Sequence, residues 1–419
     1  MVRVKSFARA TLFIFLLLCC GLGLYAQMPA LPLNYFLDQA QQNNPSLADY
    51  RNQVKSLKLD SALIYAGTKP QVNANGIGNF APSIKGYGFD QVITNGQALE
   101  GLLQVDYNLL NGNRTRNALE RVKLSADSVN YASKFTRLDL QRTITERYLF
   151  AYASQQEVEF NKQLVKLLAN EDTLLRKLTR TNIIKQSEYL TFLVSYQQQK
   201  LAFEQSILNF KSEFGALNYL SGIADTALRV LDAPTIEIEK LVETPTFFLK
   251  KFEVDSLIGI NQKSFIALRY KPKLSIYANG GYSSSLIFQP YKNFGTSVGF
   301  TFSIPIYDGH QRKLEYNKID LGLNTVDRYK SFFVTQRAQQ LNLIRQQLAS
   351  TQQLFPQIEK QLKFAKGLIE VDARLLHTGD VKISDFVIAL NNYLAAQNLF
   401  VQTTLNRYKL INQLNYWGK

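Results

Sequence analysis

Cysteine and histidine are scarce in this chain of 419 residues. The chain has two of each, and both cysteines, Cys19 and Cys20, lie within the first 26 residues. The remainder of the chain therefore cannot form a disulfide and offers no thiolate ligand for a metal.

Long apolar runs are absent after residue 26, where no run reaches sixteen residues. We therefore expect no transmembrane helix in this part. Acidic residues are also few, with 33 Asp and Glu against 48 Lys and Arg. In a cytosolic protein that excess would raise nucleic acid as a partner. The basic residues are scattered along polar helix faces, however, so we expect a solvated surface and no nucleic acid.

The usual signatures of catalysis are missing. His310 and His377 lie next to turns without the spacing of a ligand pair, so we predict that both are solvated turn residues. Glycines such as Gly76 and Gly78 are not followed by a helix, which excludes a dinucleotide-binding loop. No nucleophile elbow is present. We expect no enzymatic activity and no cofactor.

The first 26 residues predict a signal peptide. Basic residues come first, an apolar run follows, and Leu24-Tyr25-Ala26 predicts cleavage after Ala26. Two alternatives stay open. One is an uncleaved anchor, for which the apolar run is short. The other is a lipoprotein modified at Cys19 or Cys20, although the leucine before Cys19 is larger than that signal prefers. An exported chain leaves the cytosol and rarely meets nucleic acid. Cleavage would also remove three basic residues and lower the formal net charge from +15 to +12.

Two abrupt switches from strand to helix organise the rest of the chain. Apolar residues alternate with small or polar ones from Val298 to Ile306, which is the period of a strand. Asp308-Gly309 ends the strand, and a helical period then continues for about 110 residues. The same change occurs earlier, where Leu103 to Leu109 alternate and Asn111-Gly112 ends the strand.

Matching segments recur at an offset of 197 residues, which indicates an internal duplication. The matches are Gly112 with Gly309, Ser187-Glu188-Tyr189 with Ser384-Asp385-Phe386, and Leu217-Asn218-Tyr219 with Leu414-Asn415-Tyr416. The predicted class is a mixed α/β membrane protein in which each half runs helix, strand, strand, helix, helix. The first repeat is 27–222, a linker is 223–250, and the second repeat is 251–419. Predicted strands are 70–80, 99–110, 273–282 and 296–306, and predicted helices are 34–66, 113–179, 186–220, 311–376 and 383–414.

The four strands have the length and pattern of membrane strands. Each has about ten residues, with one apolar face and one small or polar face. We predict that Val105, Tyr107, Phe300 and Phe302 face lipid. Four strands cannot close a barrel, so in a membrane the chain must combine its strands with those of other copies. The alternative is two hairpins packed on a soluble helical body.

This plan resembles the bacterial outer-membrane efflux proteins of the TolC type. The resemblance rests on the duplicated order, on the two strand-turn-helix switches, and on the Gly379 turn followed by Ile383-Ser384-Asp385-Phe386. It implies a homotrimer with a twelve-stranded barrel among outer-membrane lipids and a helical coiled-coil tunnel into the periplasm. It also implies a periplasmic adaptor and an inner-membrane transporter as partners. The function it implies is export of small molecules, with type I protein secretion and a structural periplasmic coiled coil as alternatives.

The same resemblance assigns roles to the helix-helix turns. Thr181, Asn182, Gly379 and Asp380 would form the periplasmic tip, and Asp385 would line a pore constriction. Glu188 is its equivalent in the first half. The family's second aspartate is Ile388 here and its gate arginine is Val381, so the polar latch of that gate is not reproduced. A second interpretation of Asp385 and Glu188 stays open, because an acidic residue in a first helical turn also stabilises the helix N-terminus.

Overall fold

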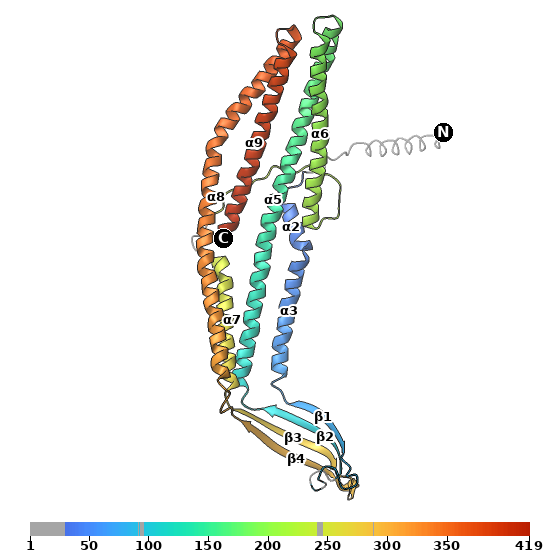
Figure 1. Cartoon of the computed structure of the whole chain (residues 1–419), viewed down its shortest axis with the longest axis vertical. Coiled ribbons are helices and arrows are strands. Elements are labelled where there is room, and N and C mark those ends of the chain that lie inside the picture. Colours follow the sequence, from blue (N-terminus) through green and yellow to red (C-terminus); the bar gives the residue numbers. More distant parts are fainter. Residues whose placement is uncertain (1–29, 91, 93–95, 241–245, 288) are drawn as a thin grey trace, which may run out of the picture. The chain divides into compact units, whose positions relative to one another are not determined.

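The computed structural model describes residues 30–90, 92, 96–240, 246–287 and 289–419. The predicted signal peptide, its cleavage site and both cysteines lie outside these residues. In the first half, the elements are α2 (Leu33–Asn43), α3 (Pro45–Ala66), β1 (Gln71–Phe80), β2 (Gln97–Asn108), α5 (Gly112–Arg180) and α6 (Gln186–Ser221). In the second half they are α7 (Thr246–Arg269), β3 (Lys273–Ser284), η1 (Pro290–Lys292), β4 (Phe294–Ser303), α8 (Gln311–Thr378) and α9 (Ile383–Trp417) (Figure 1).

Several predicted boundaries change, and among the strands β2 and β4 end at Asn108 and Ser303, before the predicted ends at 110 and 306. Asn43-Asn44-Pro45 predicts an interruption near the start of the helix over 34–66, and the structure confirms it, because the Asn44 side chain accepts hydrogen bonds from the backbone N–H groups of Ser46 and Leu47 and so starts a new helix. Pro45 at the first position of α3 lacks the N–H that would continue α2. In the second half, α7 begins at Thr246, so the last residues of the expected linker are helical. None of the helices within the described ranges is both long and apolar enough to cross a membrane.

The chain divides into two compact units that do not coincide with the predicted repeats. Unit 1 consists of the described residues up to Asn43 together with Thr143–Glu237 and Ser350–Asn412. Unit 2 consists of Asn44–Arg142, Ile238–Ala349 and Gln413–Lys419. The difference arises because the long helices α5 and α8 each contribute to both units, so that each half of the sequence is shared between them.

In unit 1, two helical hairpins share one apolar core. The second part of α5 pairs with α6, and the second part of α8 pairs with α9 (Figure 1). The part of α8 in this unit has heptad spacing, and its residues Thr351, Phe355, Ile358, Leu362, Ala365 and Ile369 are all buried or half-buried. The core residues closest to the helix turns are Leu175, Phe192, Leu376, Ile383 and Phe386, and all are at most 1% exposed.

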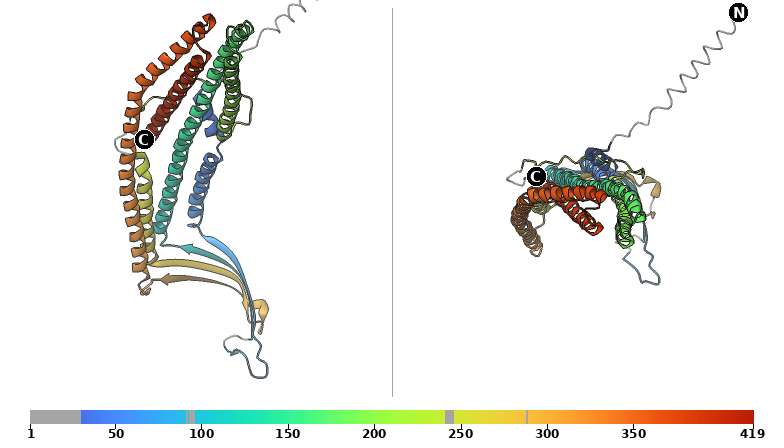
Figure 2. Two further views of the ribbon diagram at one scale, coloured as in Figure 1. Left: turned by 45° about the horizontal axis from the view of Figure 1, so that its top comes forward. Right: turned by 90° about the horizontal axis from the view of Figure 1, so that it is seen from above.

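In unit 2, the strands form one antiparallel sheet in the order β1-β2-β3-β4. Figures 1 and 2 show the four strands side by side in a single curved layer. The central pair joins the two halves of the sequence, since β2 and β3 are hydrogen bonded along their length. The end of α9 is anchored in the same unit, where the Trp417 carbonyl accepts a hydrogen bond from Arg337 and the Trp417 ring packs against Phe248 and Phe333.

Candidate functional site

The sheet has one apolar face. In antiparallel pairs, residues directly opposite one another point to the same side. Val105 lies opposite Val72 and Ala278, and Ala278 lies opposite Val298. The even-numbered residues of β1, β3 and β4 therefore share a face with the odd-numbered residues of β2. The large members of this face are Val72, Phe80, Leu99, Leu103, Val105, Tyr107, Leu274, Ile276, Tyr282, Phe294, Val298, Phe300 and Phe302. All four residues that we predicted to face lipid therefore lie on one side of the sheet.

The opposite face is polar and its side chains bond to each other. Gln104 donates a hydrogen bond to the Asp106 carboxylate at 2.9 Å, and Ser297 donates to the Asn279 side chain at 2.6 Å. On β2, Gln104 and Asp106 are half-buried, whereas Leu103, Val105 and Tyr107, which alternate with them, are exposed.

Exposure of the apolar face is high. Val298 is 83% exposed and Phe300 is 72% exposed. A sheet in a water-soluble domain covers its apolar face with other elements and leaves the polar one to solvent. This sheet has the reverse arrangement, which suits an apolar surrounding on one side and water on the other.

Both outer strands leave one edge open. Within the described residues, β1 pairs only with β2, and β4 pairs only with β3. Each open edge presents a row of unpaired backbone N–H and C=O groups, which is a template for another strand.

The two helix-helix turns have the same backbone design. Asn182 and Gly379, which are 197 residues apart, both adopt the left-handed conformation, with φ of 59° and 79°. The residue after each donates its N–H back to a helix carbonyl, Ile183 to Leu178 and Asp380 to Leu375. This bonding satisfies carbonyls that the helix end would otherwise leave open. Thr181, Asn182, Gly379 and Asp380 are all exposed at these turns.

Asp385 and Glu188 lie in the first turns of α9 and α6. Asp385 is exposed, and its carboxylate accepts a weak hydrogen bond from the neighbouring Ser384 hydroxyl at 3.3 Å. Glu188 is half-buried. Of the two positions where the sequence departs from the family pattern, Ile388 is 57% exposed and Val381 is half-buried. The structure thus places both acids beside their turns, where either a helix-end role or a pore role is geometrically possible.

Two buried acidic residues lie near these turns, and the sequence did not predict either of them. Asp372 on α8 is buried, and burial together with the nearby negative charge of Asp385 raises its pKa. Glu171 on α5 is also buried, and burial raises its pKa despite the opposing influence of His377. No local motif marks either residue, since each is one polar position on a long helix.

His377 differs from its predicted role as a solvated turn residue. It lies in the last turn of α8, and its Nε2 is 3.2 Å from a carboxylate oxygen of Glu171 on α5. Its side chain is 56% exposed, as expected of a solvated residue, but the contact with Glu171 was not predicted. The contact links the two hairpins, and nothing in the sequence pairs these positions.

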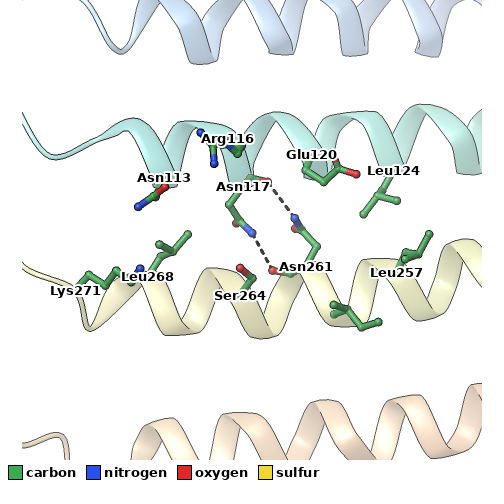
Figure 3. A pocket seen from close by; sticks show the side chains of 11 residues that line it. Asn113, Arg116, Asn117, Glu120, Leu124, Leu257, Asn261, Ser264, Leu268 and Lys271 are labelled. Carbon is green, nitrogen blue, oxygen red and sulfur yellow. Dashed lines mark hydrogen bonds between the residues drawn. The ribbon is translucent and has the colours of Figure 1, made fainter.

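A hollow between α5 and α7 in unit 2 has a polar clasp at its centre. Asn117 donates its side-chain N–H to the Asn261 carbonyl, and Asn261 donates to the Asn117 carbonyl, each at 3.1 Å (Figure 3). Both side chains are buried, and a volume of about 540 Å³ lies around them. Glu120 is the single carboxylate in the lining. The reciprocal bonds satisfy both amides, so we interpret the clasp as structural.

The chain has the fold of outer-membrane channels. Its sequence matches no known family model and no curated protein. Among solved structures, it is similar to the outer-membrane channel CmeC of Campylobacter jejuni, with a TM-score of 0.73, 13% identity, and coverage of 92% of this chain and 85% of that one. It is also similar to the outer-membrane protein VceC of Vibrio cholerae, with a TM-score of 0.73, 12% identity, and coverage of 92% and 96%. The predicted resemblance is thereby confirmed for the fold.

Proposed function

We propose that this protein is an outer-membrane channel that extends into the periplasm and exports small molecules. The observation that carries this proposal is the reversed sheet, whose apolar face is exposed and whose open edges lie on both sides. The likeness of the fold to solved outer-membrane channels supports it.

Strand length and edge chemistry favour a trimer. The strands have 10 or 12 residues, which suits a tilted crossing of the hydrocarbon core. In lipid, an open edge leaves backbone groups without partners at a cost of several kcal/mol each. If β4 of one copy pairs with β1 of the next, three copies close a twelve-stranded antiparallel barrel and remove every edge.

The helices in unit 1 also have surfaces suited to other copies. An exposed apolar stripe on α6 consists of Leu190, Val194, Leu201 and Leu208. Another on α8 consists of Phe364, Leu368, Val371 and Leu375. Their steps of three, four and seven residues are those of a coiled-coil seam. Packing the α6 stripe of one copy against the α8 stripe of the next would bury both and continue the barrel as a helical tunnel.

The turns of the two hairpins would then surround the periplasmic mouth. Three copies of Asp385 would face one axis and attract cations to a narrow opening. A periplasmic adaptor and an inner-membrane transporter would complete the export system. Type I protein secretion uses the same kind of duct, and deleting the gene separates the two: sensitivity to toxic small molecules supports efflux, whereas loss of a secreted protein supports secretion.

Engineered disulfides test the assembly directly. The chain has no cysteine after Cys20, so introduced pairs have no competing thiol if the signal is removed. We would combine Asn73→Cys or Asn75→Cys on β1 with Ser297→Cys or Thr301→Cys on β4, all on the polar face, with the single-cysteine variants as controls. At least one pair should form a covalent trimer in outer-membrane fractions, because neighbouring strands hold Cβ atoms within disulfide reach.

Purified parent protein should also conduct ions in planar bilayers. A monomer that stays soluble without detergent, and that forms no cross-link with any pair, would refute the proposal in favour of a structural periplasmic coiled coil.

A further inference from the structure

The corner between β4 and α8 contains a basic and aromatic pocket in unit 2. It has a volume of about 430 Å³, and its lining includes Tyr270, Tyr307, His310, Arg312 and Lys313. Tyr270 comes from the end of α7, and the others follow β4. A volume of this size can hold a headgroup-sized ligand.

The Arg312 side chain is held in place by aromatic rings and forms no ion pair with a carboxylate among the described residues. Its guanidinium lies 5.4 Å from the ring centroids of both Tyr270 and Tyr316, so that each ring contributes a cation–π contact. Its only side-chain hydrogen bond among the described residues is a long one of 3.4 Å to the Tyr316 hydroxyl. The remaining N–H donors are oriented and free, in the fork that matches a phosphate.

The corresponding corner of the first half uses its arginine differently. Arg114 follows the β2 turn, and its guanidinium donates to the backbone carbonyls of Leu268, Lys271 and Pro272. Those bonds come from one terminal nitrogen and hold the guanidinium against the end of α7, while the other terminal nitrogen donates to the Leu110 carbonyl. The contrast indicates that the donors of Arg312 are not required to hold the corner together.

The N-terminus of α8 is already occupied. The Asp308 carboxylate accepts hydrogen bonds from the backbone N–H groups of His310 and Arg312, at 2.9 and 2.8 Å, and from the Tyr270 hydroxyl. A ligand at this corner would therefore bind to side chains and not to the helix end. Arg312 and Lys313 together carry one more positive charge than Asp308 neutralises.

We propose that this pocket binds the phosphate of an anionic glycerophospholipid. The inference rests on the proposed function, which puts this corner where β4 leaves the bilayer. Ile304 and Ile306 follow the strand directly, and Ile306 is 97% exposed, so the lipid chains would lie along these residues while the phosphate reaches Arg312. Tyrosines and basic residues at a membrane boundary suit this arrangement.

The test uses the full-length protein purified in a neutral detergent, with lipid binding followed by native mass spectrometry during titration with phosphatidylglycerol or phosphatidylcholine. The variants are Arg312→Gln, Arg312→Lys and, as the matched control, Arg328→Gln, an exposed arginine on the same helix. Arg312→Gln should weaken phosphatidylglycerol binding roughly tenfold, the effect of one lost charge-assisted contact. Arg312→Lys should weaken it less, because it keeps the charge and loses the fork.

Arg328→Gln should bind phosphatidylglycerol like the parent, and phosphatidylcholine should bind more weakly than phosphatidylglycerol to both. Equal binding by Arg312→Gln and Arg328→Gln, with matching thermal unfolding curves, would overturn the site. Displacement of the lipid by millimolar inorganic phosphate would identify free phosphate as the ligand and overturn the lipid assignment. Conductance in planar bilayers distinguishes failure of this site from failure of the proposed function. A parent protein that conducts ions but does not prefer phosphatidylglycerol would refute only this site.

Discussion

A lysine placed in the middle of β4 tests the two faces of the sheet against each other. Val298 and Ser297 are neighbours near the centre of this strand of ten residues, and they point to opposite sides. Val298 lies opposite Ala278 on the apolar face, whereas the Ser297 hydroxyl bonds to Asn279 on the polar face. Val298→Lys and Ser297→Lys therefore make the same chemical addition at the same depth.

The depth of the lysine in the bilayer determines the expected loss of free energy. A lysine facing lipid costs about 2–4 kcal/mol at the bilayer midplane and about 0–1 kcal/mol near an interface. Val298→Lys should carry the larger penalty in every copy of an assembled trimer. Phe302→Lys lies on the same face but one residue from the end of β4, so its penalty should be smaller. Ser297→Lys should cost little beyond its hydrogen bond, because a lumen side chain stays in water.

The measurement is the fraction of heat-resistant trimer in outer-membrane fractions, with total expression as the reference. We expect the order parent, Ser297→Lys, Phe302→Lys, Val298→Lys, from most to least trimer. Equal losses for Val298→Lys and Ser297→Lys would refute the assignment of the apolar face to lipid. A reversed order would mean that the apolar face lines the inside of the assembly.

Three further predictions concern the helices. Asp385→Asn should lower cation selectivity in planar bilayers more than Glu188→Gln does, whereas a fall in thermal stability with unchanged selectivity would identify Asp385 as a helix-end residue. Asn117→Ala should lower the free energy of unfolding by about 0.5–1.5 kcal/mol, because the backbone carbonyl of Asn261 loses the Asn117 side-chain donor while the Asn261 amide keeps its backbone acceptor, and calorimetry with an exposed Asn→Ala control checks this. Glu171→Gln should flatten the dependence of stability on pH. Since burial raises the pKa of Glu171 in the folded state, the parent should lose stability as pH rises above about 4, and equal slopes for parent and variant would contradict this.

Local signals in the sequence were sufficient for the strands and the turns. The alternation that ends at Asp308-Gly309 predicted β4 because a period of two residues fixes side-chain faces. The offset of 197 residues paired the two turns, and Asn182 and Gly379 do share one backbone conformation. These features depend on neighbours along the chain, so a single sequence contains them.

Contacts between distant segments could not be obtained in this way. The Glu171–His377 pair joins α5 to α8, and the stacking of Arg312 on Tyr270 joins α8 to α7. Each depends on how two helices are rotated about their axes, which apolar spacing defines only to within a broad face. The two compact units were missed for a related reason, since an uninterrupted helix gives no signal where one packing environment ends and the next begins.

Comparing residues 197 positions apart shows a difference between the α5–α6 hairpin and the α8–α9 hairpin, whose turns would form the proposed periplasmic mouth. In the first hairpin, Asp172 accepts hydrogen bonds from Arg176 and from the Tyr189 hydroxyl, which ties α5 to α6. The residues 197 positions later are Ile369, Ala373 and Phe386, and all three are buried in the apolar core. A polar, charge-neutralised contact in one hairpin is thus an apolar contact in the other.

This difference separates the two candidate acids. Near Glu188, the carboxylate of Asp172 is balanced by Arg176 at 2.8 Å. Near Asp385, the neighbouring acid is Asp372, whose pKa the charge of Asp385 helps to raise, and no described cation forms an ion pair with either. Two carboxylates thus lie close together at the second hairpin, and like charges close together favour taking up protons or attracting cations. We therefore expect Asp385 to contribute more than Glu188 to any cation selectivity of an assembled mouth, and Glu188 to contribute mainly to the start of α6.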